Sequence, residues 1–184
     1  MSWIDQRPDD AMAGAFEMIG PSPMQTVGPE AFRDAMSRLG AAVHVVATDG
    51  PAGRMGFTAT AACSVSDQPA TLLVCVHRRS RSAPALSTNG VFTVNTLRAD
   101  EEAIADMFAG RGAVEMSARF ASTQWLTLET GAPVLVSSVV AFDCRVVEIK
   151  AVASHNVIFG AVAGVHLGAP GPALVYHQRE YKRV

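Results

Sequence analysis

The sequence predicts a mainly β fold, an antiparallel barrel with a few helices on its rim. Strand patterns come in two runs, of four and then about three, instead of alternating with helices as they do in a doubly wound sheet. Glycines interrupt the longest strand pattern, as is typical of a barrel wall that bends. No G-x-G-x-x-G motif follows a strand, so the chain lacks the fingerprint of a dinucleotide-binding sheet.

Composition sets the outer bounds of the prediction. The 184 residues suffice for one domain with its own core, and the hydrophobic content of 49% is that of a globular protein. A net charge of -2 argues against recognition of nucleic acid or an anionic membrane by bulk charge. The N-terminus has no signal-peptide pattern and no apolar run could span a bilayer, so we expect a cytoplasmic protein.

The three cysteines do not indicate a metal or disulfide framework. Cys63, Cys75 and Cys144 are odd in number and widely spaced, with no C-x-x-C motif. Cys75 and Cys144 sit in apolar runs, where a buried structural thiol is the usual interpretation. The five histidines show no metal-ligand spacing, so we expect no metal site.

The chain opens with an arm and a helix. Residues 1–27 carry acidic, Gly-Pro and scattered apolar positions, and we expect a flexible or dimer-packed arm before a domain of residues 28–184. Pro29 suits the first helical turn. One apolar stripe then follows at helical spacing, formed by Phe32, Ala35, Met36 and Leu39. Gly40 ends this helix.

The first run of strands is expected at 42–48, 56–62, 71–76 and 91–96. A Ser-Val-Ser turn at 64–66 is expected after the second of them, and a short helix at 80–86, capped by Ser80 or Ser82, before the fourth.

The second half returns to strands after irregular chain. A helix is expected from Asp100, which would cap it, to Gly110, and a helical turn at 115–120 within the mostly irregular segment 111–133. Strands are expected around 142–147, at 156–167 and at 173–176, followed by a polar tail at 178–183.

Three stretches could carry chemistry. In Arg54–Ser66 small residues alternate with hydroxyls, which suits a flat ring close to the backbone but equally suits an edge strand rich in Thr. His77–Ser82 brings three arginines and two serines to a helix start, a plausible phosphate cradle or a solvated basic loop. Ser154-His155-Asn156 opens an apolar strand, where a lone histidine is more often structural than functional.

Taken in order, these stretches resemble the flavin reductase family with the FMN-binding split-barrel fold. The resemblance runs from Phe32 to Tyr181, through FRDAMSRLGAAVHVVATDG, GFTATAACSVSDQPATLLVCVHRRSRS, GVFTVNTL, RF, GAPVL, AFDCRV, SHNVIFGAV and LVYHQREY. It is greatest to the FMN reductases of pyrimidine degradation and to the reductase components of 4-hydroxyphenylacetate monooxygenases.

The resemblance implies an antiparallel Greek-key split β-barrel, a homodimer, and FMN or FAD reduced by NADH or NADPH. It implies that His155 is catalytic, near the nicotinamide, and that Tyr181 lies near the flavin or the dimer interface. The other flavin-binding residues that it implies are Gly56, Phe57, Thr58, Ala59, Thr60, Cys63, Ser64, Val65, Ser80, Arg81 and Ser82. Relatives often have Ser or Thr in place of Ala62 or Cys63, which leaves the group near the flavin N5 atom open.

The resemblance therefore predicts a reductase that hands reduced flavin to a monooxygenase component. This chemistry needs aligned rings and no nucleophile, which agrees with the absence of hydrolase motifs. Two alternatives stay open from the sequence. One is a bound-FMN reductase acting on another acceptor, such as a corrinoid or a ferric centre, and the other is a flavin-binding or haem-binding module without enzymatic activity.

Overall fold

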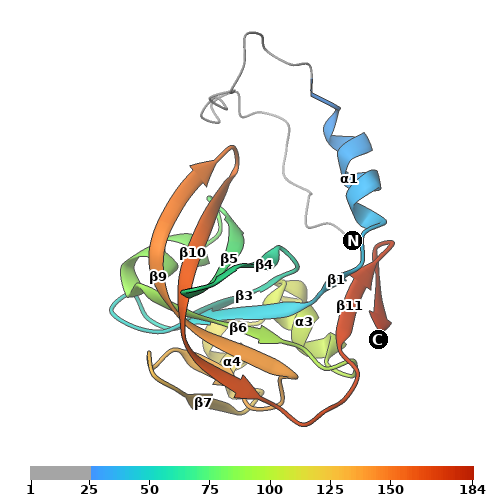
Figure 1. Cartoon of the computed structure of the whole chain (residues 1–184). Helices are drawn as coiled ribbons and strands as arrows, with labels where there is room; N and C mark the ends of the chain where they lie inside the picture. Colours follow the sequence, from blue (N-terminus) through green and yellow to red (C-terminus); the bar gives the residue numbers. More distant parts are fainter. Residues whose placement is uncertain (1–25) are drawn as a thin grey trace.

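The computed structural model describes residues 26–184. Its largest element is a seven-stranded antiparallel sheet with the strand order β3-β2-β6-β9-β10-β5-β4. These strands are β2 (His44–Thr48), β3 (Met55–Ala59), β4 (Ala62–Asp67), β5 (Ala70–His77), β6 (Val91–Thr96), β9 (Val140–Val152) and β10 (His155–Leu167). The two long strands β9 and β10 form a hairpin that rises from the body of the protein (Figure 1).

The two edges of this sheet are neighbours in the sequence. Only Thr60 and Ala61 separate the edge strands β3 and β4, so the sheet curls until its edges come together at that turn. No ladder of hydrogen bonds joins β3 to β4, and the barrel is therefore split there. The amide of Cys75 donates to the carbonyl of Ala61 at 3.0 Å, which attaches the turn to β5.

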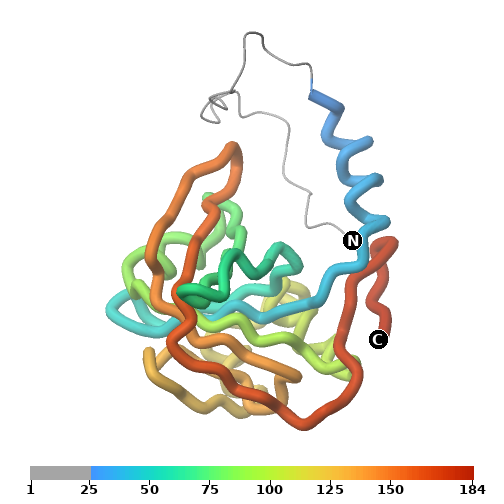
Figure 2. The backbone as a smooth tube through the Cα atoms, viewed as in Figure 1, coloured from blue at the N-terminus to red at the C-terminus, as the bar shows by residue number. Residues whose placement is uncertain are grey.

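A second, three-stranded sheet joins the C-terminus to the start of the domain. Its order is β1-β11-β12, with β1 at Ala41–Ala42, β11 at Leu174–His177 and β12 at Glu180–Arg183. Figure 2 shows this C-terminal hairpin beside the N-terminal part of the domain. The expectation of a polar tail at 178–183 was wrong. The missed hairpin turns on Gln178 and Arg179, which have positive φ angles although neither is a usual turn residue.

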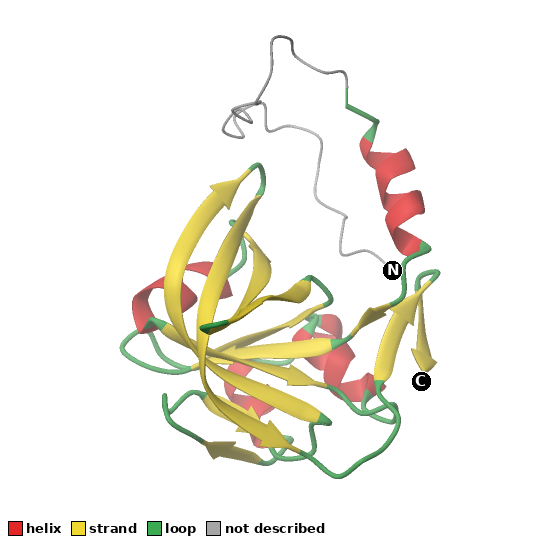
Figure 3. Cartoon of the chain, in the orientation of Figure 1, coloured by secondary structure: helices red, strands yellow, loops and turns green. Residues whose placement is uncertain are grey.

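Four α-helices surround the sheets, and they are α1 (Pro29–Ser37), α2 (Ser82–Asn89), α3 (Glu102–Phe108) and α4 (Met116–Ala121). Each lies where a helix or helical turn is expected, with shifted ends. Asp100 does not cap α3, because Glu101 takes that position. Helix α1 buries no residue and contacts the domain at the β11–β12 turn, where the Gln178 amide donates to the Ser37 carbonyl at 2.6 Å, so its apolar stripe is exposed (Figure 3).

The segment between α3 and β9 is less irregular than expected. It contains a short 3-10 helix at Arg111–Ala113, helix α4, and a small hairpin of β7 (Trp125–Thr127) and β8 (Pro133–Leu135). The expected turn at 64–66 was also wrong, because Ser64 and Ser66 belong to β4. That strand is exposed along most of its length and one of its edges is unpaired.

The core has two parts. The first part lies inside the large sheet and includes Phe92, Val74 and Ile158. The second lies between that sheet and α3 and includes Leu97 and Phe108. The β9–β10 register shifts beside both expected glycines, with Val147 of β9 as the extra residue opposite Gly160 and Ala163 of β10 as the extra residue beside Gly164. The chain therefore has irregularities at both glycines, as the sequence predicts. At Gly160 the reason is packing, because a Cβ atom there would lie 2.5 Å from Cζ of Phe92.

Candidate functional site

A strip of partly exposed side chains lies on the face of β4, β5 and β10 that points away from the first core. Directly opposed residues of antiparallel strands share a face. Cys63 is opposite Leu73, Phe159 is opposite Leu73 from the other side, and Val157 is opposite Cys75. The residues between them on β5, and Ile158 and Gly160 on β10, are buried, while Asn156 is half-buried. We call these residues, Cys63, Leu73, Cys75, Val157 and Phe159, the outer strip.

Two histidines close one end of the outer strip. His77 ends β5, His155 begins β10, and the two are direct partners in the ladder. Their rings meet edge to face, with centroids 5.0 Å apart and planes at 83°. Partial burial, followed by the neighbouring His77, lowers the pKa of His155 below its usual value. His155 is therefore a neutral imidazole near pH 7, able to donate or accept a hydrogen bond.

The loop between β5 and α2 lies beside this histidine pair. The amide of Ser80 donates to the His77 carbonyl at 2.8 Å, and the amide of Ser82 donates to the Ser80 hydroxyl oxygen at 3.2 Å. Arg81 is exposed and forms no hydrogen bond or ion pair with residues 26–184. An exposed guanidinium beside the N-terminus of α2 suits an anion such as a phosphate.

Arg78 joins this loop to the tip of the β9–β10 hairpin. Its amide donates to the Ser154 carbonyl at 3.0 Å, and its guanidinium reaches the Ala153 carbonyl at 3.4 Å. The Ser154 hydroxyl lies 2.9 Å from Nδ1 of His155. The structure thus brings together the Ser80–Arg81 loop and His155, which the sequence names as two separate stretches.

The rest of the expected flavin-binding stretch is divided between surface and interior. Ser64 and Val65 are exposed on β4, and Thr60 is half-buried at the β3–β4 turn. Phe57 packs against the first core. Ser82 is also buried within the fold.

Three expected residues of β3 have little surface to offer. Gly56 lies beneath Phe108, and Ala59 is buried. Thr58 is 3% exposed, and its hydroxyl donates to the Ala105 carbonyl at 2.6 Å. The roles of these β3 residues in flavin binding stay predictions.

Tyr181 lies with the second core and not with the outer strip. Its hydroxyl donates to Oδ1 of Asp106 on α3 at 2.8 Å, and its ring packs edge to face on Tyr176. Burial and the Asp106 carboxylate raise the pKa of this phenol above its usual value. The structure therefore gives Tyr181 a partner within its own chain, and its expected place near the flavin stays a prediction.

Sequence reasoning did not select the members of the outer strip other than Cys63, nor His77. The available signal was the alternation along β5, where Leu72, Val74 and Val76 face the core and the residues between them must face outward. What could not be read from the sequence was the pairing of β5 with β10, which sets the other half of the strip.

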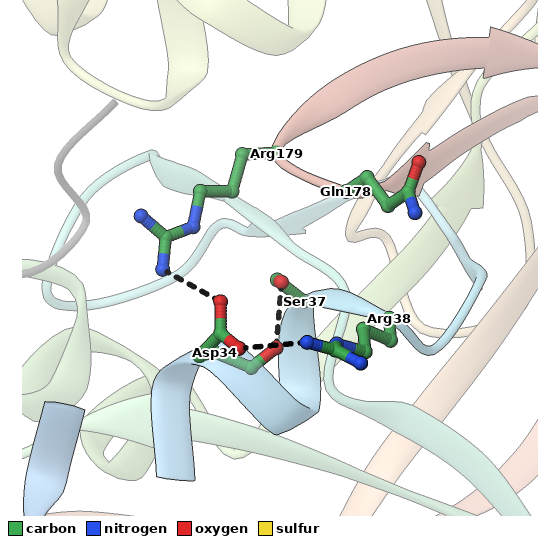
Figure 4. Close-up of a pocket in the computed structure, with 5 residues that line it drawn as sticks. All are labelled: Asp34, Ser37, Arg38, Gln178 and Arg179. Atoms are coloured by element: carbon green, nitrogen blue, oxygen red, sulfur yellow. Dashed lines mark hydrogen bonds and ion pairs between the residues drawn. The ribbon is translucent and has the colours of Figure 1, made fainter. Parts of the chain in front are cut away.

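Two further hollows lie elsewhere on the surface. One, of about 560 Å³, lies between α1 and the β11–β12 turn (Figure 4). Its two arginines, Arg38 and Arg179, both approach the single carboxylate of Asp34, at 3.2 Å and 3.8 Å, so each guanidinium already has an ion-pair partner. The other, of about 440 Å³, lies by Arg54 and Phe120, and this arginine is paired with Asp49. Within residues 26–184, every arginine of the two hollows lies within ion-pair distance of a carboxylate, unlike Arg81 at the start of α2.

The outer strip and its loop fit a flat aromatic ring with a phosphate tail. Partly exposed apolar side chains can pack on a ring, and the exposed Arg81 can bond the anion. Within residues 26–184, no three His, Cys, Asp or Glu side chains gather as metal ligands would. The same residues include no helix long and apolar enough to cross a membrane.

Comparison with known proteins agrees with this chemistry. Residues 36–184 match the family model described as a flavin reductase like domain. A curated relative from Ancylobacter novellus, named FMN reductase (NADH) RutF, is 50% identical over 165 residues, which are 90% of each chain.

Solved structures show the same fold. A putative flavin reductase from Haemophilus somnus is 40% identical, with a TM-score of 0.82 over 86% of this chain and 100% of that chain. BorF, described as the flavin reductase component of a bacterial two-component tryptophan halogenase, is 26% identical, with a TM-score of 0.79 over 85% of this chain and 98% of that one.

Proposed function

This chain belongs to the flavin reductase-like domain family, and on that basis we propose that it is an NADH-dependent FMN reductase that supplies reduced flavin to a partner monooxygenase. The observation that carries this proposal is the 50% identity, over nine-tenths of both chains, to an FMN reductase that uses NADH. The fold is the split barrel of this family, as the similarity to solved flavin reductases indicates.

We place the flavin ring over the outer strip and its phosphate at the Ser80–Arg81 loop. Support for this placement comes from the exposed Arg81 guanidinium and from the partly exposed apolar side chains that run towards it. The backbone hydrogen bonds of Ser80 and Ser82 fix the loop before any ligand arrives, which lowers the entropy cost of binding.

The bound flavin supplies the hydride chemistry, accepting a hydride from the nicotinamide. The protein's part is to align the two rings and to keep water away from the reacting atoms. The outer strip offers an apolar surface for one ring, and His155, neutral near pH 7, offers a hydrogen bond at its edge. No residue has to act as a nucleophile or as a strong base.

A homodimer is part of the proposal. Strand β4 is exposed along most of its length with a free edge, and Phe32, Met36 and Leu39 of the α1 segment are about half exposed. Covering these surfaces with a second copy would remove apolar area from water. The cytoplasmic location expected from the sequence stays a prediction.

The deciding experiment is an anaerobic assay with purified protein, FMN and NADH, followed by ultrafiltration. We expect the flavin absorbance to bleach as NADH is consumed, with the reduced flavin recovered in the filtrate. Bleaching with all flavin retained on the protein would instead indicate a bound-flavin enzyme with another acceptor. FMN binding without bleaching would indicate a binding module, and no FMN binding would refute the proposal.

A further inference from the structure

His77 makes two contacts that no other side chain of the site makes together. Its Nδ1 atom accepts a hydrogen bond from the amide of Arg79 at 3.1 Å, inside the β5–α2 loop. Its ring meets the ring of His155 edge to face at 5.0 Å. One imidazole thus touches both the loop proposed for the phosphate and the residue proposed for the nicotinamide.

The first contact fixes the protonation of His77. An amide can only donate, so Nδ1 must present its lone pair and the ring proton must sit on Nε2. The His77 carbonyl also accepts the amide of Ser80, at 2.8 Å. The loop therefore begins with two successive hydrogen bonds to the same residue, one to its side chain and one to its backbone.

The second contact fixes the place of His155. The two histidines are direct partners in the β5–β10 ladder, and His155 is also opposite Val152 across the tight β9–β10 turn. The Ser154 hydroxyl holds Nδ1 of His155, and the His77 ring limits the rotation of the imidazole from the β5 side.

We propose that His77 is a positioning residue that couples the phosphate-binding loop to His155. This inference rests on the proposed function for the ligands of the two parts. With His77 in place, the loop and the His155 ring take up defined positions together. Without its Nδ1 acceptor, the Arg79 amide loses its partner and the loop loses the shape that presents Arg81 to an anion.

Several basic groups, His77 among them, lie near His155. Arg78 reaches the turn from the loop, Arg79 lies in the same loop, and Lys150 is on β9 opposite Val157. Among these groups His77 is the one that lowers the pKa of His155, after partial burial. Removing the His77 imidazole should therefore raise the pKa of His155.

Three variants separate these roles. His77→Asn keeps an acceptor, Oδ1, close to the position of Nδ1, while His77→Phe keeps a ring beside His155 without the acceptor. His77→Gln places its amide further out and serves as a second variant without the acceptor in case the Phe variant does not fold. Circular dichroism and thermal melts report folding for all three.

The first readout is binding of FMN against riboflavin, which lacks the phosphate, measured by flavin fluorescence without NADH. We expect the preference for FMN to fall about three- to tenfold in His77→Phe and His77→Gln, as for the loss of one hydrogen bond. His77→Asn should keep the parent's preference. General damage to the fold would weaken the binding of FMN and riboflavin equally. An unchanged ratio of the two affinities in His77→Phe and His77→Gln would therefore overturn the coupling.

The second readout is an NMR titration of the His155 imidazole, which needs neither flavin nor turnover. We expect its pKa to rise in His77→Asn and in His77→Phe, because neither variant carries the imidazole that lowers the pKa of His155 in the parent. An identical titration in parent and variants would refute the contact between the histidines. If the parent protein does not oxidise NADH but both readouts are as expected, the proposed function would be refuted and the role of His77 would stand.

Discussion

The phenol of Tyr181 donates to Oδ1 of Asp106, the same carboxylate oxygen that the guanidinium of Arg111 approaches at 2.5 Å. One carboxylate on α3 therefore holds the C-terminal hairpin on one side and the chain after α3 on the other. The contact with Tyr181 was not predictable from spacing, because Asp106 and Tyr181 are 75 positions apart.

Replacing Tyr181 with Phe should lower the free energy of unfolding by about 1.5–3 kcal/mol at neutral pH, the usual contribution of a hydrogen bond to a charged acceptor. The neutral phenol is favoured in the fold, because its pKa is raised above the usual value of about 10. Its contribution is complete below about pH 10 and is lost as the pH rises further. Urea melts of both proteins at neutral and at high pH should show the difference between them shrinking. A constant difference would contradict this.

The double variant Ser80→Ala, Arg81→Ala should weaken FMN binding roughly 10- to 100-fold, since it removes a charged donor and a loop hydrogen bond. Turnover at saturating FMN should change much less. Equilibrium titration with FMN and riboflavin measures this, with Arg38→Ala on α1 as an exposed control. Unchanged FMN affinity in the folded double variant would remove the loop from the site.

His155→Ala should raise the apparent KM for NADH or lower kcat, while FMN affinity is kept. Because its pKa lies below the usual value of about 6.5, the parent's activity should stay level through neutral pH and change only under more acidic conditions. Steady-state kinetics across pH test this, with His166→Ala near the other end of β10 as the control. Parent-like kinetics in His155→Ala would exclude it from the site.

Protonation of His44 should lower the free energy of unfolding in mild acid. Its Nδ1 atom lies 3.1 Å from the Thr96 hydroxyl, and burial lowers its pKa to about 4. A depressed pKa favours the neutral ring in the fold, so its contribution is present above about pH 6.5 and lost as the pH falls towards 4. The loss could reach about 3 kcal/mol. His44→Asn should flatten this part of the curve in urea melts, and an equally steep fall would assign it to other groups.

The sequence predicts well those elements whose conformation depends on the local residue pattern. Strand β6 lies at the expected residues 91–96, and the β9–β10 register shifts beside the two glycines of β10. Prediction from the sequence fails for strands that form only because another strand pairs with them. Strand β12 carries one apolar residue, Tyr181, and becomes a strand because β11 lies opposite.

The candidate site also has one part with a local sequence signal and another part that only strand pairing creates. The Ser80–Arg81 loop has a local signal, because a helix start rich in Arg and Ser suits an anion, whereas only the family resemblance gives His155 a role. The outer strip as a whole has no such signal, because Val157 faces Cys75 only once β10 has paired with β5. Its members come from segments that show no shared motif.

The position of β5 in the sheet has a consequence for how the protein is made. Its two neighbours are β4, which ends at residue 67, and β10, which begins at residue 155. At a synthesis rate of about 5–20 residues per second, β10 follows β5 from the ribosome by roughly 4–16 s. Throughout that interval the apolar segment Thr71–Val76 has one edge without its partner. The growing chain is therefore exposed to aggregation at this apolar strand until β10 emerges, and a chaperone on the ribosome would protect it there.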